Sequence, residues 1–466
     1  MLKRLLTLLL TLCLFLALVP TAEAASAPTL SSTSAILYSL NSGDVIFEKN
    51  ADAVLAPASL TKIVTTMVVL EMCSDLEGTY VTVPNAGLFD EIRAVGGSNI
   101  DLTVGERLSV NDLLYAVMLP SACDACSVLA YHFGNGNVQT FVERMNTWAR
   151  EAGAVSTTFR NAHGLDAPGH KSSARDISKI ILKALQNEKF VEIINTFEHL
   201  IPENDYHAKR YVNYQSTIPM LYEYSGEYYK GMVGIKSGYT LQAKCCLSSM
   251  ATRGDETFLA VCMGAPKEGG TNHARSDTRA LYDWAFANFE TKTVKRAGEV
   301  IATATLSGAT APSATVSLKE DLVVCTQKDA GEVQLFPNLK NPATAPFSEE
   351  AGTLEVVQNG KVIATRTLSF DTVPTPALPQ TPADTELTND GPSAVMIVGI
   401  AALVLLAVLA AAVVLLSRPA PKKRTVARVK APLSRREQTG YGAPKSTRPP
   451  QRPAPRGPQN NNRRQG

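Results

Sequence analysis

Residues 56–72 read APASLTKIVTTMVVLEM and have the pattern of a buried α-helix. The apolar side chains recur at the spacing of one helix face, at Leu60, Ile63, Val64, Met67 and Val68. Lys62 lies in the first turn of this helix, between apolar neighbours and three residues after Ser59. Because an isolated charge is costly in apolar surroundings, a lysine at this position calls for a chemical explanation.

The spacing of Ser59 and Lys62 fits the activation of a serine nucleophile. Residues at i and i+3 share one face of a helix. A serine hydroxyl attacks well only when a nearby base takes its proton, and a lysine is such a base only when it is neutral. Burial or a second nearby cation lowers the pKa of a lysine toward that state. The alternative is that Ser59 is an ordinary helix N-cap.

Two further short motifs follow in the chain. Ser121-Ala122-Cys123 lies at a break between two apolar stretches with helical spacing, 110–119 and 126–133. Lys236-Ser237-Gly238 lies at the end of a strand-like run and is followed by Tyr239. Ser-x-x-Lys, then Ser-x-Asn, then Lys-Thr/Ser-Gly, in this order, is the motif set of the penicillin-interacting serine enzymes.

The chain resembles the low-molecular-mass penicillin-binding proteins, which form the D-alanyl-D-alanine carboxypeptidase family. Four segments carry the resemblance: LAPASLTKIVTTMV at 55–68, MLPSACDACSVLA at 118–130, FRNAHGLDAPGHKSSARDISKI at 159–180 and GMVGIKSGYTLQAKCCL at 231–247. It extends over roughly residues 30–372, about three quarters of the chain.

The resemblance implies a serine acyl-enzyme mechanism. Ser59 attacks the carbonyl of the penultimate D-alanine, Lys62 takes the serine proton, and Ser121 relays a proton toward the departing D-alanine. Water then hydrolyses the acyl-enzyme. The implied substrate is the peptidoglycan stem peptide, and β-lactams are the implied covalent inhibitors. The family requires no metal and no cofactor.

The third motif is implied to hold the substrate. Lys236 supplies positive charge for the terminal carboxylate and helps to keep the lysine of the first motif neutral, and Ser237 hydrogen-bonds the same carboxylate. Gly238 lets the substrate approach the strand. The backbone N–H groups of the nucleophile and of Tyr239 form the oxyanion hole, in which one donor is worth roughly 3 kcal/mol.

One position departs from the family pattern. The second motif usually ends in asparagine, and here it ends in Cys123, which the resemblance places against the substrate. An amide can both donate and accept hydrogen bonds, whereas a thiol is weak in both roles. The difference favours a change in rate or in outcome, including transpeptidation instead of hydrolysis. A thiol lining an open cleft is also a candidate redox-sensitive group.

Two other functions are compatible with parts of this pattern. A β-lactamase needs a deacylating carboxylate, and no Glu-x-x-Leu-Asn occurs between the second and third motifs. A non-catalytic wall-binding protein is the third hypothesis, with Cys123 marking lost chemistry. His163 and Asp166 suggest a Ser-His-Asp triad, but they match a structural loop of the family and Lys62 already supplies the base.

The pattern between the two ends predicts an α+β fold with two domains. The first, 25–290, is the catalytic domain of the β-lactamase and DD-peptidase type, in which helices flank an antiparallel sheet. Its strand-like runs lie at 232–238, 245–252 and 257–265. The second, 291–372, is a small all-β domain whose last hairpin turns at Gln358-Asn359-Gly360.

The two ends predict export and a membrane anchor. Residues 1–24 read as a signal peptide, with Lys3 and Arg4 before an apolar run and Ala22-Glu23-Ala24 after it. Residues 373–393 hold five prolines and read as a stalk. Residues 394–416 carry no charge and are long enough to span a bilayer. Because cations follow at once, the tail 417–466 is expected to be cytoplasmic and disordered, and the catalytic domain extracellular.

Charge and cysteine content exclude other classes. The tail carries a net charge of +13 and the leader +1, so subtraction from the total of +2 leaves −12 on residues 25–416. An acidic body argues against a nucleic-acid-binding domain. Seven cysteines remain after the signal peptide, an odd and scattered set that does not suggest a disulfide framework. Cys123-x-x-Cys126 lacks the second ligand pair of a zinc finger.

Overall fold

The computed structural model describes residues 26–206, 213–340, 343–344 and 346–377. The predicted signal peptide, membrane span and basic tail lie outside these residues, as does most of the predicted stalk. Within the described part of the chain, none of the helices combines the length and apolar character needed to cross a bilayer.

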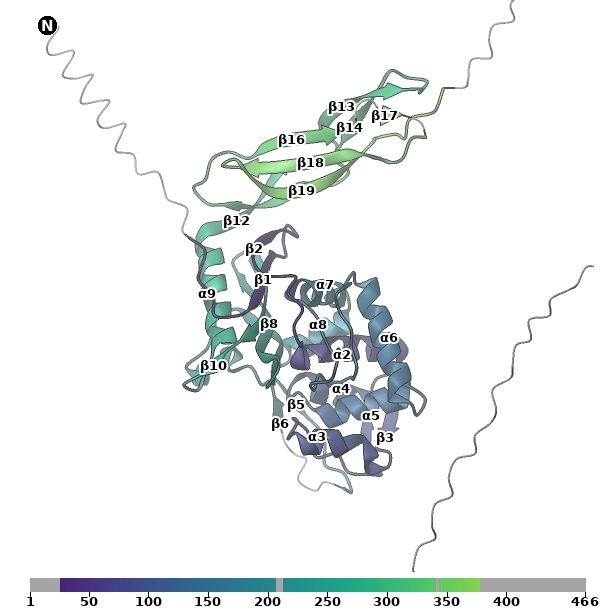
Figure 1. Ribbon diagram of the computed structural model, residues 1–466, viewed down its shortest axis with the longest axis vertical. Helices are drawn as coiled ribbons and strands as arrows, with labels where there is room; N and C mark the ends of the chain where they lie inside the picture. The colour runs from purple at the N-terminus through teal and green to yellow at the C-terminus, as the bar shows by residue number, and fades with distance from the viewer. Residues whose placement is uncertain (1–25, 207–212, 341–342, 345, 378–466) are drawn as a thin grey trace, which may run out of the picture. The chain divides into compact units, whose positions relative to one another are not determined.

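A five-stranded antiparallel sheet forms the centre of the catalytic region (Figure 1). Its strands, in spatial order, are β2 (Val45–Lys49), β1 (Ser34–Ser39), β9 (Glu256–Ala265), β8 (Lys244–Arg253) and β7 (Met232–Thr240). The three runs that the sequence predicts at 232–265 are β7, β8 and β9, and β1 and β2 form the hairpin with which the domain begins. The predicted α+β class is confirmed.

Helices cover both faces of this sheet. Alternate residues of β1 and β9 enter different cores: Ile36 and Val261 pack with the main helical group, whereas Leu37 and Cys262 pack with α9 (His273–Asn288). The main group comprises α2 (Lys62–Met72), α4 (Val110–Met118), α5 (Cys123–Phe133), α6 (Val138–Glu151), α7 (Ala174–Ala184) and α8 (Glu188–Asn195). Because both faces are covered, β8 and β9 read as nearly continuous apolar runs.

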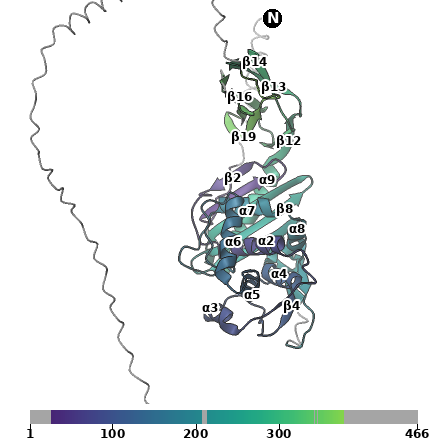
Figure 2. The ribbon, with the colours of Figure 1, turned by 90° about the vertical axis from the view of Figure 1, so that its right-hand side faces the viewer.

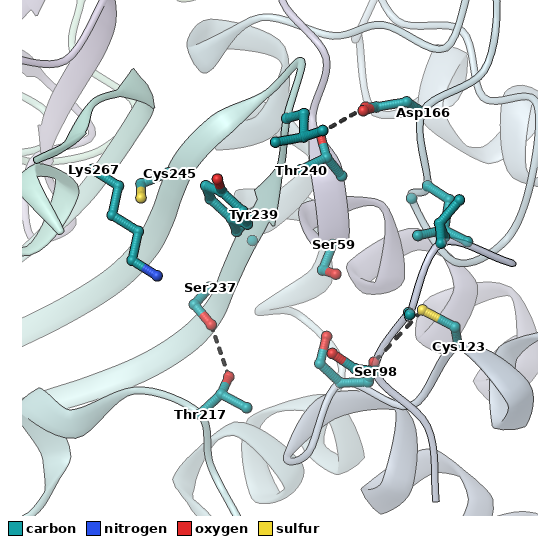
Figure 3. A pocket seen from close by; sticks show the side chains of 18 of the residues that line it. Ser59, Ser98, Cys123, Asp166, Thr217, Ser237, Tyr239, Thr240, Cys245 and Lys267 are labelled. Carbon is teal, nitrogen blue, oxygen red and sulfur yellow. Dashed lines mark hydrogen bonds between the residues drawn. The ribbon is translucent and has the colours of Figure 1, made fainter. Parts of the chain in front are cut away.

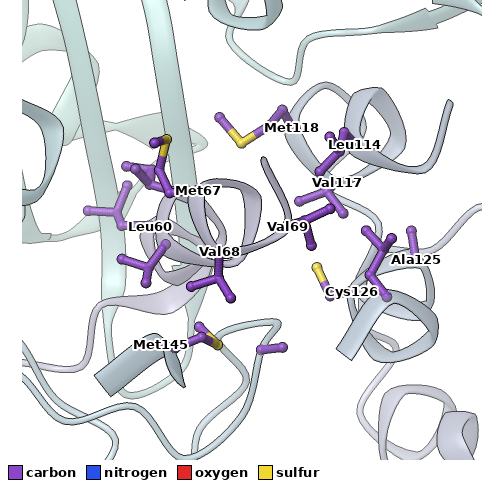
Figure 4. Packing of buried hydrophobic residues seen from close by; sticks show 14 of the residues in the cluster. Leu60, Met67, Val68, Val69, Leu114, Val117, Met118, Ala125, Cys126 and Met145 are labelled. Atoms are coloured by element: carbon purple, nitrogen blue, oxygen red, sulfur yellow. The ribbon is translucent and has the colours of Figure 1, made fainter. Parts of the chain in front are cut away.

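Helix α2 lies inside this group, and Figures 1 and 2 show it among α4, α5 and α6. Its side chains from Lys62 to Val69 are all buried. Figure 4 shows Val68 and Val69 facing residues of α5 and α6. The helix begins later than the sequence pattern suggests, since residues Ala58–Thr61 form a 3-10 turn before it. Ser59 therefore lies in that turn and is not the N-cap of α2.

Short elements complete the catalytic region. They are β3 (Tyr80–Thr82), the 3-10 turn Ala86–Phe89, α3 (Asp90–Ala94), β4 (Arg107–Ser109), β5 (Glu198–Leu200), β6 (Asn213–Gln215), the 3-10 turns Pro219–Leu221 and Glu223–Ser225, β10 (Lys267–Glu268) and β11 (Thr271–Asn272). Neither these short elements nor α6 and α8 are among the predicted ones, and elements of two to five residues are too short to show a periodic pattern.

The following region is built from strands with a core of its own. They are β12 (Phe289–Lys295), β13 (Val300–Ser307), β14 (Ser313–Ser317), β15 (Leu322–Gln327), β16 (Gln334–Leu339), β17 (Ala343–Thr344), β18 (Glu350–Gln358) and β19 (Lys361–Ser369). Asn359 and Gly360 both have positive φ, as the tight turn between β18 and β19 requires. The β-rich character predicted for 291–372 agrees with these strands, whereas its domain boundaries stay predictions.

Candidate active site

The three sequence motifs meet in one cleft of about 660 Å³. Ser59 comes from the 3-10 turn before α2, Ser121 and Cys123 from the start of α5, and Ser237 to Tyr239 from β7. Figure 3 shows Ser59 between the β7 residues on one side and Cys123 on the other. Residues far apart in the sequence are thus placed around one hydroxyl group.

Lys62 points at Ser59 from the first turn of α2. Its Nζ lies 3.1 Å from Ser59 Oγ, 3.4 Å from Cys123 Sγ and 2.5 Å from the carbonyl oxygen of His163. The lysine side chain is fully buried, while Ser59 is half-buried and open to the cleft. The pair therefore has the geometry that proton transfer from the serine requires.

Lys236 is the second buried lysine of the site. Its side chain is 1% exposed, and its Nζ donates to the carbonyl oxygen of Ser237 at 3.2 Å. Burial is the largest cause that lowers the pKa of Lys236, to about 7. In the free site this amine is therefore partly deprotonated near neutral pH, and an anion bound beside it would favour the charged form.

Gly238 has a structural role that the motif alone did not indicate. A Cβ at this position would lie 2.9 Å from the backbone nitrogen of Ser59 and 3.0 Å from Ala58 Cβ. The glycine thus lets β7 approach the turn that carries the nucleophile, in addition to the substrate approach expected from the sequence. Next to it, Ser237 Oγ shares a hydrogen bond of 2.8 Å with Thr217 Oγ1 (Figure 3).

The start of α5 holds the second motif in a strained turn. Ser121 is buried and has a φ of 66°, which is uncommon for a residue other than glycine. The turn is fixed by hydrogen bonds from Ala122 N to Ala116 O and from Cys123 N to Ser98 O, at 2.9 and 2.7 Å. Cys123 lines the cleft with its thiol directed at Lys62, so this residue contacts the catalytic base as well as the space for a substrate.

The profile of peptidase family S11, D-alanyl-D-alanine carboxypeptidase, matches residues 21–267. The chain belongs to this family. It is 30% identical over 337 residues to the D-alanyl-D-alanine carboxypeptidase DacF of Bacillus subtilis, covering 71% of this chain and 82% of that protein. It is 35% identical over 283 residues to DacC of Escherichia coli, covering 59% of this chain and 67% of that one.

Solved structures agree with this assignment. Penicillin-binding protein 5 of Haemophilus influenzae superposes with a TM-score of 0.62 at 27% identity, over 75% of this chain and 99% of that one. The Streptomyces K15 DD-transpeptidase superposes with a TM-score of 0.51 at 28% identity, over 56% of this chain and all of that one.

In this carboxypeptidase-family chain, the segment 160–166 supports the first motif. Gly164 has a φ of 88°, and a Cβ on it would lie 2.0 Å from the carbonyl oxygen of Ala58. Asn161 fixes the segment by accepting from Gly164 N and donating to Leu165 O. The segment therefore packs its backbone directly against the turn that contains the nucleophile, as its interpretation as a structural loop predicts.

The side chains of His163 and Asp166 do not form a triad with Ser59. The His163 ring accepts from Leu165 N, its Nε2 lies 3.9 Å from a Glu91 carboxylate oxygen, and burial lowers its pKa to about 3. Asp166 accepts from Thr240 Oγ1 at 2.6 Å (Figure 3). Lys62 contacts the backbone carbonyl of His163 and not its side chain. A pattern of side chains in the sequence could not have indicated this contact.

Two cations that lie outside the motifs also line the cleft. Lys267 Nζ lies 5.4 Å above the ring of Tyr239, and Arg275 pairs with Glu227 at 2.7 Å. They come from β10 and from the first turn of α9. Neither residue lies in a recognisable motif, and only the fold brings them to β7, so the sequence alone does not indicate them.

Proposed function

We propose that the chain is a serine-type D-alanyl-D-alanine carboxypeptidase that removes the terminal D-alanine from peptidoglycan stem peptides. Membership of the S11 family supports the reaction class. The single observation that carries the residue assignment is the contact of buried Lys62 Nζ, at 3.1 Å, with Ser59 Oγ, whose residue lines the cleft of about 660 Å³.

Acylation follows from this contact. Lys62 accepts the hydroxyl proton as Ser59 Oγ forms a bond with the carbonyl carbon of the penultimate D-alanine. The backbone N–H groups of Ser59 and Tyr239 stabilise the oxyanion. As the C–N bond breaks, the departing amine takes a proton relayed by Ser121. A water molecule, deprotonated by the same lysine, then cleaves the ester and releases the shortened peptide.

The terminal carboxylate of the substrate is assigned to the Lys236 side of the cleft. Ser237 Oγ and Thr217 Oγ1 lie within 2.8 Å of each other there, and both can donate to a carboxylate. Lys236 carries the compensating charge, and binding of the anion favours its protonation. Lys267 adds positive potential at the same cleft, whereas the charge of Arg275 is paired with Glu227.

Transpeptidation is the second candidate outcome, and Cys123 is the observation that favours it. The thiol stands beside Lys62 where the family motif usually has an amide, so the base that activates the incoming water has a weaker hydrogen-bonding neighbour. A solved relative of 28% identity is named as a DD-transpeptidase. The ratio of free D-alanine to cross-linked product, measured with an added amino-acid acceptor, separates the two outcomes.

The cellular location is proposed from the sequence alone. Residues 1–24 act as a cleaved signal peptide and residues 394–416 as a single membrane span. The catalytic domain then lies outside the cell, where its substrate is, and the basic tail 417–466 lies in the cytoplasm.

A fluorescent penicillin tests the proposal directly. The native chain should be labelled covalently and lose the label slowly, while Ser59→Ala should not be labelled. Rapid loss of the label would identify a β-lactamase instead. If the correctly folded native chain takes up no label and releases no D-alanine from a stem pentapeptide, the acyl-enzyme proposal fails and a wall-binding protein becomes the better assignment.

A further inference from the structure

The first turn of α5 carries two thiols in a Cys-x-x-Cys arrangement. Cys123 is the first residue of the helix and Cys126 the fourth, after the N-cap residue Ala122. Helix geometry places the Cα atoms of residues i and i+3 about 5 Å apart. This value lies inside the range of roughly 4.4–6.8 Å that a disulfide bridges. The backbone therefore already has the spacing that a disulfide between the two requires.

The two thiols have different surroundings. Cys123 lines the cleft (Figure 3). Its Sγ lies 3.4 Å from Lys62 Nζ. Cys126 is fully buried behind it, beside Val69 of α2 (Figure 4), and its Sγ donates to the carbonyl oxygen of Ala122 at 3.1 Å. Burial raises the pKa of the Cys126 thiol to about 12. Cys123 is thus 3% exposed, at the wall of the cleft and next to a base, whereas Cys126 is enclosed in the core.

The other described cysteines are not arranged in this way. All seven cysteines of the described residues are buried and unbridged, and the remaining five are Cys73, Cys245, Cys246, Cys262 and Cys325. Of these five, only Cys245 lines the cleft, and its sequence neighbour Cys246 faces the opposite core of the sheet. Adjacent strand residues that point to opposite faces are poorly placed for a disulfide.

We propose that Cys123 and Cys126 form a reversible disulfide in the wall of the active site, by exchange with a small disulfide, and that this bond inactivates Ser59. Cys123 gives its proton to Lys62 and its thiolate attacks the small disulfide, from which one thiol departs with that proton. The sulfur of Cys126 then attacks Cys123 in the mixed disulfide, and its own proton leaves with the second thiol. Two protein thiols are oxidised, and one disulfide is reduced to two thiols.

Inactivation follows from what the same turn holds in place. The disulfide draws Cys123 Sγ away from Lys62 and removes one of the three contacts that position the amine. It also constrains the turn that keeps Ser121 at its strained φ. Lys62 would thus serve two nucleophiles, Ser59 in the reduced protein and Cys123 during oxidation. This consequence for activity rests on the proposed function, whereas formation of the bond does not.

The test compares the reduced and oxidised full-length chain. The reduced protein is treated with hydroxyethyl disulfide, mapped by peptide mass spectrometry and labelled with fluorescent penicillin. We expect a Cys123–Cys126 link, with a mass about 2 Da lower, and a fall in labelling of about tenfold or more that dithiothreitol reverses. In Cys126→Ser, the reagent should stay on Cys123 as a mixed disulfide. Cys123→Asn should keep its labelling after treatment, and Cys73→Ser should behave as the native chain.

Three results would overturn the inference. The native chain could keep the reagent as a stable mixed disulfide, or it could form the Cys123–Cys126 disulfide without any change in penicillin labelling. The third result is that treated Cys123→Asn loses its penicillin labelling. The experiment distinguishes failure of the disulfide proposal from failure of the proposed carboxypeptidase function. If the reduced native chain takes no label, the proposed activity fails, while the peptide map still decides whether the two cysteines join.

Discussion

The side chain of Lys62 is buried, and its amine is surrounded by groups that fix its direction. Among the described residues, its hydrogen-bond partners are a hydroxyl, a thiol and a backbone carbonyl, and none of them is a carboxylate. These contacts direct the amine at Ser59 Oγ, 3.1 Å away, which is within the reach that proton transfer from the serine requires.

Replacement of this amine tests the assignment at the level of one residue. Lys62→Met keeps the length and the apolar stem, so the fold should hold, and the melting temperature should not fall. The rate of labelling by fluorescent penicillin should drop by roughly 10²- to 10⁴-fold, the usual contribution of a general base. Ser59→Ala, which lacks the nucleophile, should give no labelling. A variant labelled within a few-fold of the native rate would rule out Lys62 as the base.

Lys236 gives a pH-dependent prediction. Its pKa of about 7 in the free site means that the cationic form decreases as the pH rises above 7. A substrate carboxylate needs that cation, so KM for a stem pentapeptide should rise between pH 7 and 9, while kcat, which reports the complex, should change less. Lys236→Arg carries a permanent charge and should flatten the rise in KM. A KM that is constant over this range in the native enzyme would contradict the prediction.

At the scale of the element, the turn Ala58–Thr61 depends on glycines from two other segments. Gly164 and Gly238 both approach its backbone, and a Cβ on either would meet Ala58 or Ser59 at 3.0 Å or less. The nucleophile is therefore positioned by the close packing of β7 and of the segment 160–166 against one short 3-10 turn. Its placement does not depend on helix α2 alone.

A pair of glycine variants separates this packing from backbone strain. Gly164 and Gly43 both have positive φ, but a Cβ on Gly43 meets nothing within 4 Å. Gly43→Ala should lower the free energy of unfolding, measured with urea, only by the cost of a left-handed backbone, about 1–2 kcal/mol. Gly164→Ala should lower the free energy of unfolding by more than this. It should also be labelled by penicillin more slowly, because the turn that carries Ser59 is displaced. Equal losses of stability with unchanged labelling would show that the segment does not position Ser59.

The same elements show what the sequence could and could not predict. Residue patterns identified the strands β7, β8 and β9 and the helix α2, because these are long and apolar. The three motifs identified the side chains that meet in the cleft. The 3-10 turn before α2 was read as helix, since the first turn of either has the same composition. The His163 carbonyl and the cations Lys267 and Arg275 depend on tertiary approach, which local patterns do not record.

At the scale of the whole molecule, the acidic residues 25–416 and the basic tail 417–466 are expected on opposite sides of the membrane, outside the cell and in the cytoplasm. The net charge of −12 on residues 25–416 and of +13 on 417–466 follows from the sequence. The described residues up to Ala377 belong to one compact unit. The enzymatic part is therefore expected to keep its fold when the predicted anchor is removed, which makes the location of the protein testable through its activity.

Two deletions carry that test. Removal of 394–466 takes away an uncharged stretch of 23 residues, about 35 Å of helix, and should release penicillin-labelled protein into the medium. Removal of 431–466 keeps this stretch and its six flanking cations, so the labelled protein should stay with the membrane fraction. External protease should degrade the labelled domain in intact cells that carry the second form. If both forms reach the medium equally, residues 394–416 do not anchor the enzyme, and its retention near the wall must come from the folded part of the chain.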